Sequence, residues 1–147
     1  MGSDTGFSIE IADWDRDQET LRSIREAVFV VEQNVPVELE WDGVDQDCVH
    51  VIAYANDRSA VGTGRLLPDG HIGRLAVLAS WRGRGAGSSL LLKLVAIAKA
   101  RGIGPIALNA QTHALVFYER FGFVAEGNDF DDAGIPHRHM LLKILQD

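Results

Sequence analysis

The stretch Ile72-Gly-Arg-Leu-Ala-Val-Leu78, with Ala-Ser-Trp-Arg82-Gly-Arg-Gly85-Ala-Gly87 directly after it, decides the fold, because it predicts a strand that runs through a glycine-rich turn into a helix. The expected helix covers residues 87–100, where one face is apolar at helical spacing: Leu90, Leu91, Leu94, Val95 and Ala98. Ser88 and Ser89 are expected to satisfy the first unpaired N–H groups of this helix.

The turn itself predicts a site for a phosphate group. Gly83, Gly85 and Gly87 allow the backbone to bend without a Cβ penalty, so that N–H groups and the positive end of the helix can point at one anion. Arg82 and Arg84 add positive charge at the same place. The alternative interpretation is a tight connection that needs flexible residues and binds no ligand.

Two common phosphate sites do not match this pattern. A P-loop would end on Lys-Ser or Lys-Thr, and no such pair closes the turn. The third glycine of a dinucleotide fingerprint would fall on Ser88, and the next expected strand, residues 106–110, offers the amide of Asn109 rather than an acidic side chain for a ribose. The sequence therefore favours neither a P-loop NTPase nor a dinucleotide-binding fold.

The composition predicts a folded protein with an acidic surface. At 147 residues the chain suffices for one domain, expected over residues 1–147, around a single core. The net charge of −7 disfavours nucleic acid and anionic membranes as partners. Because Arg74, Arg82 and Arg84 lie close together in sequence, a local positive site is expected within this acidic molecule.

A cytoplasmic location is expected. The chain has no apolar run near the roughly twenty residues that span a bilayer, and no basic-then-apolar leader. Its one cysteine, Cys48, fits a reducing compartment and lacks the neighbours that would make it a nucleophile. No metal site is expected, because neither Cys48 nor the histidines His113, His137 and His139 have the spacing of a metal-ligand set.

The rest of the chain predicts an α/β fold with a mixed sheet and helices on both faces. Residues 7–11 alternate as a strand, and Asp15 or Asp17 can cap a helix with an apolar face of Leu21, Ile24, Ala27, Val28 and Val31. Residues 49–55 and 60–67 predict an antiparallel hairpin. Strand 106–110 is expected parallel to strand 72–78, with a ligand crevice at their carboxyl ends.

Several segments together resemble the GCN5-related N-acetyltransferase (GNAT) superfamily. Arg82-Gly-Arg-Gly85-Ala-Gly87 matches RxxGxG, the acetyl-CoA pyrophosphate loop of that family, and Ala114-Leu-Val-Phe-Tyr-Glu-Arg-Phe-Gly-Phe123 resembles its second cofactor segment. Three further segments are similar to the small ElaA-like branch: Val28-Phe-Val-Val-Glu-Gln33, Asp42-Gly-Val-Asp45 and Gly134-Ile-Pro-His137. The resemblance covers roughly residues 20–144.

This resemblance implies a GNAT-like domain, with N-terminal antiparallel strands before a parallel β-α-β unit, that takes acetyl-CoA as co-substrate. The two parallel strands are expected to splay, so that backbone groups near Ala76 and Val77 bond pantetheine as an added strand would. The residues expected to bind the cofactor are Leu75, Ala76, Val77, Arg82, Gly83, Arg84, Gly85, Ala86, Gly87, Asn109 and Phe117. The expected partner is a small-molecule or peptide amine, and formation of a homodimer is left as an open alternative.

The catalytic residues implied by the resemblance begin with Tyr118. A tyrosine of pKa near ~10 can protonate the leaving thiolate without ionising first. The alternative is that Tyr118 completes an aromatic core patch, and both roles are compatible. For the base that takes a proton from the amine, Glu32 is the first candidate and His137 the second; a water chain to solvent is a third possibility.

The sequence thus predicts an N-acetyltransferase that moves an acetyl group directly to an amine nitrogen in a ternary complex. Two other functions stay open. One is a module that senses acyl-CoA without turnover, and the other is a nucleotide-binding protein that uses the same loop.

Overall fold

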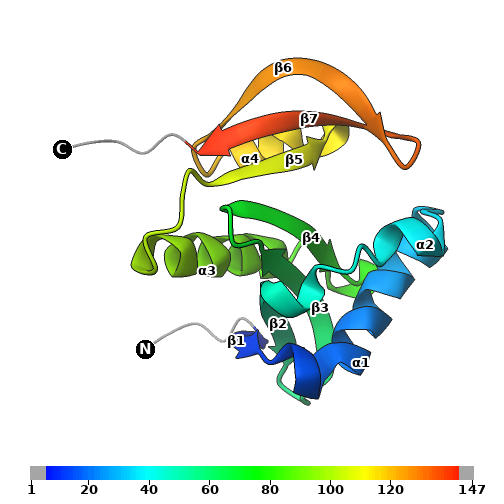
Figure 1. Cartoon of the computed structure of the whole chain (residues 1–147). Helices are drawn as coiled ribbons and strands as arrows, with labels where there is room; N and C mark the ends of the chain where they lie inside the picture. Colours follow the sequence, from blue (N-terminus) through cyan, green and yellow to red (C-terminus); the bar gives the residue numbers. More distant parts are fainter. Residues whose placement is uncertain (1–5, 143–147) are drawn as a thin grey trace.

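The computed structural model describes residues 6–142 as an α/β fold built on one mixed sheet (Figure 1). The strands are β1 Phe7–Ala12, β2 Val49–Ala55, β3 Ala60–Leu66, β4 His71–Val77, β5 Ala107–Gln111, β6 Phe123–Asp132 and β7 Ile135–Leu142. The α-helices are α1 Trp14–Arg25, α2 Val37–Glu40, α3 Ala86–Ala100 and α4 Leu115–Glu119, and α1 continues as the π-helix η1 Glu26–Glu32. Short 3-10 turns η2, η3 and η4 cover Asp45–Asp47, Ala79–Trp81 and Thr112–Ala114.

The sheet has the strand order β1-β2-β3-β4-β5-β7-β6. All neighbours are antiparallel except β4 and β5, which run parallel as the sequence predicts. β4 and β5 pair only at His71↔Ala107 and Ile72↔Leu108, so they diverge beyond Ile72. Figure 1 shows the resulting gap in the sheet, with β1–β4 on one side and β5–β7 on the other. The expected splay of these two strands is confirmed.

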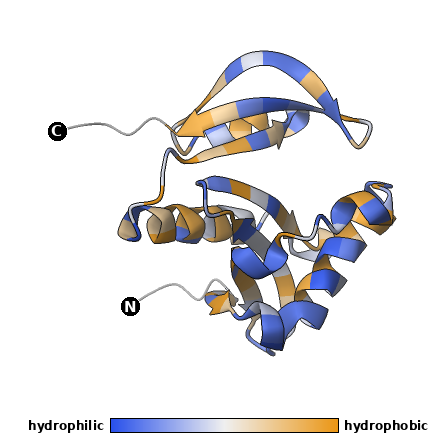
Figure 2. Cartoon of the chain, in the orientation of Figure 1, coloured by the Kyte–Doolittle hydropathy of each residue, from blue (hydrophilic) through white to orange (hydrophobic). Residues whose placement is uncertain are grey.

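Helices α1 and α3 cover opposite faces of the N-terminal strands, as Figure 1 shows. Ala76 of β4 packs with Ile24 and Val28 from α1 and η1. Its neighbour Val77 packs on the other face, in the core that contains Leu90, Leu91 and Leu94 of α3. Figure 2 shows the difference between the two helices: α1 is mostly hydrophilic on the side in view, whereas α3 is largely apolar.

Both helix N-termini differ from the prediction. Asp13, not Asp15 or Asp17, caps α1 by accepting a hydrogen bond from the N–H of Asp15, while Asp17 returns the bond to the N–H of Asp13. Helix α3 begins at Ala86, so the serines expected to cap it lie inside its first turn, and its N-cap is Gly85. The first turn of α3 is therefore left without a side-chain cap, and its N–H groups face the glycine-rich turn.

The apolar face predicted for the first helix is correct only in part. Leu21, Ile24 and Val28 are buried, but Val31 is 70 % exposed. The π-helix is the physical reason, because its wider turn ends the 3.6-residue periodicity and rotates Val31 out of the core. Within residues 6–142 no helix has the length and apolar character needed to span a membrane.

Candidate active site

A cleft of about 540 Å³ opens where β4 and β5 diverge. It lies at the carboxyl ends of two parallel strands, the usual position of a ligand crevice in such sheets. The predicted site residues that line it come from η1, β4, the turn after β4, β5, α4 and β7: Glu32, Leu75, Ala76, Val77, Arg82, Asn109, Tyr118 and His137. The structure therefore brings together the three candidate catalytic residues and five of the eleven predicted cofactor residues. The other six are not among the residues that line the cleft: Gly83, Arg84, Gly85, Ala86, Gly87 and Phe117.

The edge of β4 offers backbone groups to this cleft. The N–H of Leu78 donates to the carbonyl of Val61 in β3, at 2.9 Å. Because alternate residues of a strand direct their polar groups to opposite edges, the N–H and C=O of Val77 point away from β3 and toward the cleft. This is the edge at which the sequence predicts that pantetheine adds as a strand.

The glycine-rich turn joins β4 to α3 with the expected backbone freedom at two of its three glycines. Gly83 and Gly85 have φ values of 78° and 89°, in the left-handed region that favours glycine. Gly87 instead lies in the first turn of α3, where an added Cβ would be 3.7 Å from Val77 and 3.8 Å from Phe117. The end of β4, the start of α3 and the tyrosine helix α4 thus meet at Gly87.

The arginines near the turn do not form the shared positive site that the sequence predicts. Arg82 donates from Nε to the carbonyl of Val77 at 3.0 Å, and both of its Nη atoms bind the carboxylate of Glu32 at 2.5 and 2.6 Å. Arg84 lies over the ring of Trp81, 4.5 Å from the centroid. Arg74 lines the cleft but does not add free positive charge beside the turn, because its guanidinium pairs with Glu40 at the end of α2.

Glu32 is held as a carboxylate by this contact. The hydrogen bonds and charge of Arg82 keep the pKa of Glu32 below its ordinary value, which makes the carboxylate a weaker base. The first candidate for the catalytic base is therefore paired with a residue predicted to bind the cofactor. The next residue along η1, Gln33, accepts a hydrogen bond from Nε2 of Gln111 in β5 at 2.8 Å.

Tyr118 faces the cleft from α4. Its ring packs edge-on against Phe117 and Phe123, with centroids 5.0 and 6.1 Å away, so it belongs both to an aromatic patch and to the cleft wall. Burial raises the pKa of Tyr118 to about 12. The phenol is therefore protonated throughout the physiological pH range.

His137 lies on β7, paired across the sheet with Gln111 of β5. Its Nδ1 atom is 2.7 Å from the carbonyl of Ile135. A carbonyl only accepts hydrogen bonds, so Nδ1 carries the proton and the lone pair of the neutral ring lies on Nε2. Phe130 stacks on the ring with 25° between the planes, which fixes its orientation beside the cleft.

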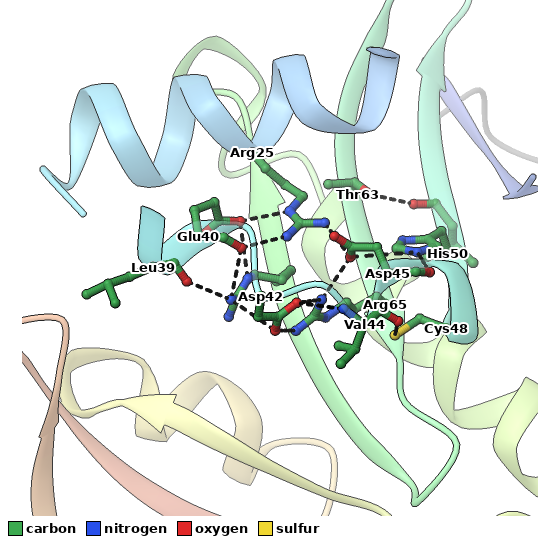
Figure 3. A network of polar contacts seen from close by, with 12 residues as sticks. Arg25, Leu39, Glu40, Asp42, Val44, Asp45, Cys48, His50, Thr63 and Arg65 are labelled. Carbon is green, nitrogen blue, oxygen red and sulfur yellow. Dashed lines mark hydrogen bonds and ion pairs between the residues drawn. The ribbon is translucent and has the colours of Figure 1, made fainter. Parts of the chain in front are cut away.

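A largely buried ion network, of which only Asp42 is exposed, borders the cleft, and the sequence did not predict it. Its members alternate in sign and come from α1, the segment 40–45 and strands β3 and β4 (Figure 3): Arg25, Glu40, Asp42, Asp45, Arg65 and Arg74. Helical spacing does contain a signal, because Arg25 follows Leu21 by four residues and so falls on the buried face of α1. Beside this network, Nε2 of His50 donates a hydrogen bond to the carbonyl of Asp45 at 2.8 Å.

Cys48 lies beside the same network. Its Sγ atom donates to the carbonyl of Val44 at 3.3 Å, and burial raises the pKa of the thiol to about 11.

No cluster of three or more metal-ligating side chains occurs between residues 6 and 142.

Comparisons with known proteins agree with this architecture. The sequence profile described as an acetyltransferase (GNAT) domain matches residues 15–144. The chain belongs to the GNAT acetyltransferase family. The GNAT relatives of known sequence include the uncharacterized N-acetyltransferase YjcF of Bacillus subtilis, 40% identical over 80% of this chain and 86% of the relative. They also include protein ElaA of Escherichia coli, 33% identical over 86% of this chain and 87% of the relative.

Solved GNAT structures confirm the predicted fold. The crystal structure of an acyl-CoA N-acyltransferase from Pseudomonas aeruginosa has a TM-score of 0.83 and 30% identity, over 93% of this chain and 99% of that one. The crystal structure of Escherichia coli ElaA also has a TM-score of 0.83 and 30% identity, over 92% and 99% of the two chains. This GNAT is thus an acyltransferase, and its fold implies an acyl-CoA co-substrate and an amine acceptor.

Proposed function

We propose that the protein is an N-acetyltransferase that uses acetyl-CoA and transfers the acetyl group directly to an amine nitrogen of a small molecule or peptide within a ternary complex. The observation that carries this proposal is the glycine turn with left-handed backbone at Gly83 and Gly85, which follows β4 and Arg82, both of which line the cleft. As part of the same proposal, the protein acts in the cytoplasm and binds neither nucleic acid nor membranes.

The residues present fit an acyl-CoA molecule. Space around Gly83 and Gly85 is open, since a Cβ added at either position would meet nothing within 4 Å. The uncapped first turn of α3 supplies N–H groups for the diphosphate. Arg84 can add its charge, and Arg82 can do so when the diphosphate displaces the carboxylate of Glu32. The cleft-facing backbone of Val77 matches an amide of pantetheine, and it can also polarise the thioester carbonyl.

His137 and Tyr118 have different roles in the proposed reaction. Acetyl-CoA supplies an activated acyl carbon, to which the amine nitrogen forms a C–N bond as the C–S bond breaks and the sulfur leaves as thiolate. Nε2 of His137 accepts the proton that the amine loses; its fixed lone pair makes it better supported than Glu32. Tyr118 donates a hydrogen bond to the departing sulfur. Because its pKa is about 12, Tyr118 stabilises the thiolate rather than protonating it early.

Ligand-induced stabilisation tests the proposal against its alternatives. In thermal unfolding, CoA and acetyl-CoA at a hundred times the dissociation constant should stabilise the protein by about 2.7 kcal/mol, while ATP and NAD should not. Free thiol should then appear when acetyl-CoA is mixed with a suitable member of an amine panel. Stabilisation by CoA without thiol release on any amine would indicate a sensor, and stabilisation by ATP or NAD alone would indicate a nucleotide-binding protein.

The two candidate bases can be separated by a matched pair of variants. We expect His137→Gln to lower kcat/KM at neutral pH by about 100-fold, because a general base contributes roughly 10² to 10⁴ in rate. Glu32→Gln should leave the pH profile of kcat/KM unchanged and tighten CoA binding, because Arg82 is released from a competing carboxylate. The measurements are kcat/KM between pH 6 and 9 and the dissociation constant of CoA. An altered pH profile in Glu32→Gln alone would return the role of base to Glu32.

A further inference from the structure

Strand β4 contains a bulge directly before the cleft-lining residues. Thr63 pairs with Ala76 and Arg65 pairs with Gly73, so three steps along β4 match two along β3. The additional residue lies at Arg74 or Leu75, and Arg74 has a φ of 51°. A left-handed backbone is unfavourable for a residue with a Cβ, by about 1–2 kcal/mol, so the surrounding structure must hold Arg74 in place.

The side chain of Arg74 provides such a tether. Its Nε atom lies 3.1 Å from Oε2 of Glu40, and its Nη2 atom donates to the carbonyls of Glu40 at 3.1 Å and Leu39 at 3.4 Å. These contacts join β4 to the end of α2, a segment more than thirty residues earlier in the chain. No similar tether would be required in a regular strand, where Arg74 would have an ordinary extended backbone.

Glu40 is itself held rigidly. Only 2% of it is exposed, and its Oε2 atom also accepts a hydrogen bond from Nε of Arg25 at 2.7 Å (Figure 3). Arg25 reaches on to Asp45 at 2.7 Å, and Asp45 binds Arg65, the residue on β3 opposite the bulge, at 2.8 Å. The network thus contacts the bulge through Arg74 of β4 and Arg65 of β3, and Arg25 connects it to α1.

The charges of this network balance within it. Arg25, Arg65 and Arg74 face the three carboxylates of Glu40, Asp42 and Asp45. Replacing buried ion pairs with apolar residues of similar volume often leaves the folding stability unchanged or raises it. A gain in stability therefore does not explain why the protein has this network. Such networks can instead specify one backbone arrangement.

We propose that Arg74 and Glu40 are positioning residues, which hold the β4 bulge and thereby aim the backbone of Leu75–Val77 into the cleft. A one-residue slip in a strand exchanges the edges to which its N–H groups point and the faces to which its side chains point. Without the bulge, the N–H of Val77 would turn toward β3, and Ala76 would leave the face covered by α1. This inference rests on the proposed function, because it concerns the amides that would bind and polarise the acyl group.

Two substitutions at Arg74 separate the backbone effect from loss of the charge. Arg74→Ala and Arg74→Gly remove the same guanidinium, but only glycine adopts a left-handed backbone without strain. We expect Arg74→Ala to lower kcat about 100-fold, the effect of losing one donor to the reacting oxygen, and Arg74→Gly to recover most of that loss. The CoA dissociation constant should rise in Arg74→Ala and stay near the wild-type value in Arg74→Gly, because the backbone of Val77 is proposed to bind a pantetheine amide. Equal kcat values for the two variants would overturn the proposal.

Crystal structures of the same variants give a readout that does not depend on turnover. The glycine variant should retain a positive φ at position 74 and the pairing of Thr63 with Ala76. The alanine variant should lose both. An alanine variant that keeps the bulge would overturn the positioning role even if the wild-type protein turned over no amine, whereas absence of wild-type turnover with loss of the bulge would count against the proposed function alone.

Discussion

Replacing Gly85 with Asp is expected to abolish CoA binding in a protein that still folds. Space is available, because nothing lies within 4 Å of an added Cβ, and the strain of a side chain at the φ of 89° costs about 1–2 kcal/mol, which a folded domain can absorb. The added charge, however, would lie where the diphosphate is proposed to bind. Two unit charges about 4 Å apart interact by about 4 kcal/mol at the effective dielectric constant of a protein surface, so we expect affinity to fall by at least about 100-fold.

The matched control is Gly85→Asn. Asparagine has nearly the same shape as aspartate and adopts the φ of 89° found at Gly85 with less strain than most residues, but it is neutral. Calorimetric titration with CoA should therefore show weak or no binding for the aspartate variant and measurable binding for the asparagine variant. Undiminished CoA affinity in Gly85→Asp would mean that the diphosphate binds elsewhere.

Tyr118→Phe is expected to lower kcat about 100-fold without changing the affinity for CoA, the usual effect of removing one hydrogen-bond donor to a developing negative charge. The phenylalanine ring preserves the contacts with Phe117 and Phe123, so the variant removes only the hydroxyl. Rapid-quench measurement of acetyl transfer, together with the CoA dissociation constant, would separate the chemical step from binding.

The pH dependence gives a second test of Tyr118. Burial raises its pKa to about 12, so the protonated form persists at every pH below that value. Ionisation of Tyr118 should therefore cause no loss of rate between pH 8 and about 10. Over this range the wild-type protein and the phenylalanine variant should have pH profiles of the same shape. Equal kcat values in the two proteins would leave Tyr118 with a packing role only.

The parts of the site that depend on local sequence were predictable. A strand, a glycine turn and a helix follow one another directly at residues 71–100, so periodicity and glycine spacing locate them within a residue or so. The hairpin β2–β3 and the parallel pairing of β4 with β5 were likewise predicted and are confirmed. The roles of Glu32, Tyr118 and His137 stay predictions.

The parts that depend on distant contacts were not predictable. Arg74 lies a few residues before the glycine turn in sequence, and only the folded chain reveals that it pairs with Glu40, more than thirty residues earlier. The ion pair between Glu32 and Arg82 likewise joins residues fifty positions apart. The apolar spacing of the first helix also does not predict η1. A π-helix changes that spacing only within the wider turn itself, so the preceding residues contain no sign of it.

The partly buried position of Cys48 has a practical consequence for any study of this enzyme. Thiol reagents attack the thiolate, and a group whose pKa is about 11 is almost entirely in the unreactive form near neutrality. As Cys48 is the sole cysteine in the sequence, colour developed by a sulfhydryl dye during turnover would report liberated coenzyme with little background from the protein. The same masking would protect the enzyme from mixed-disulfide formation with its own product.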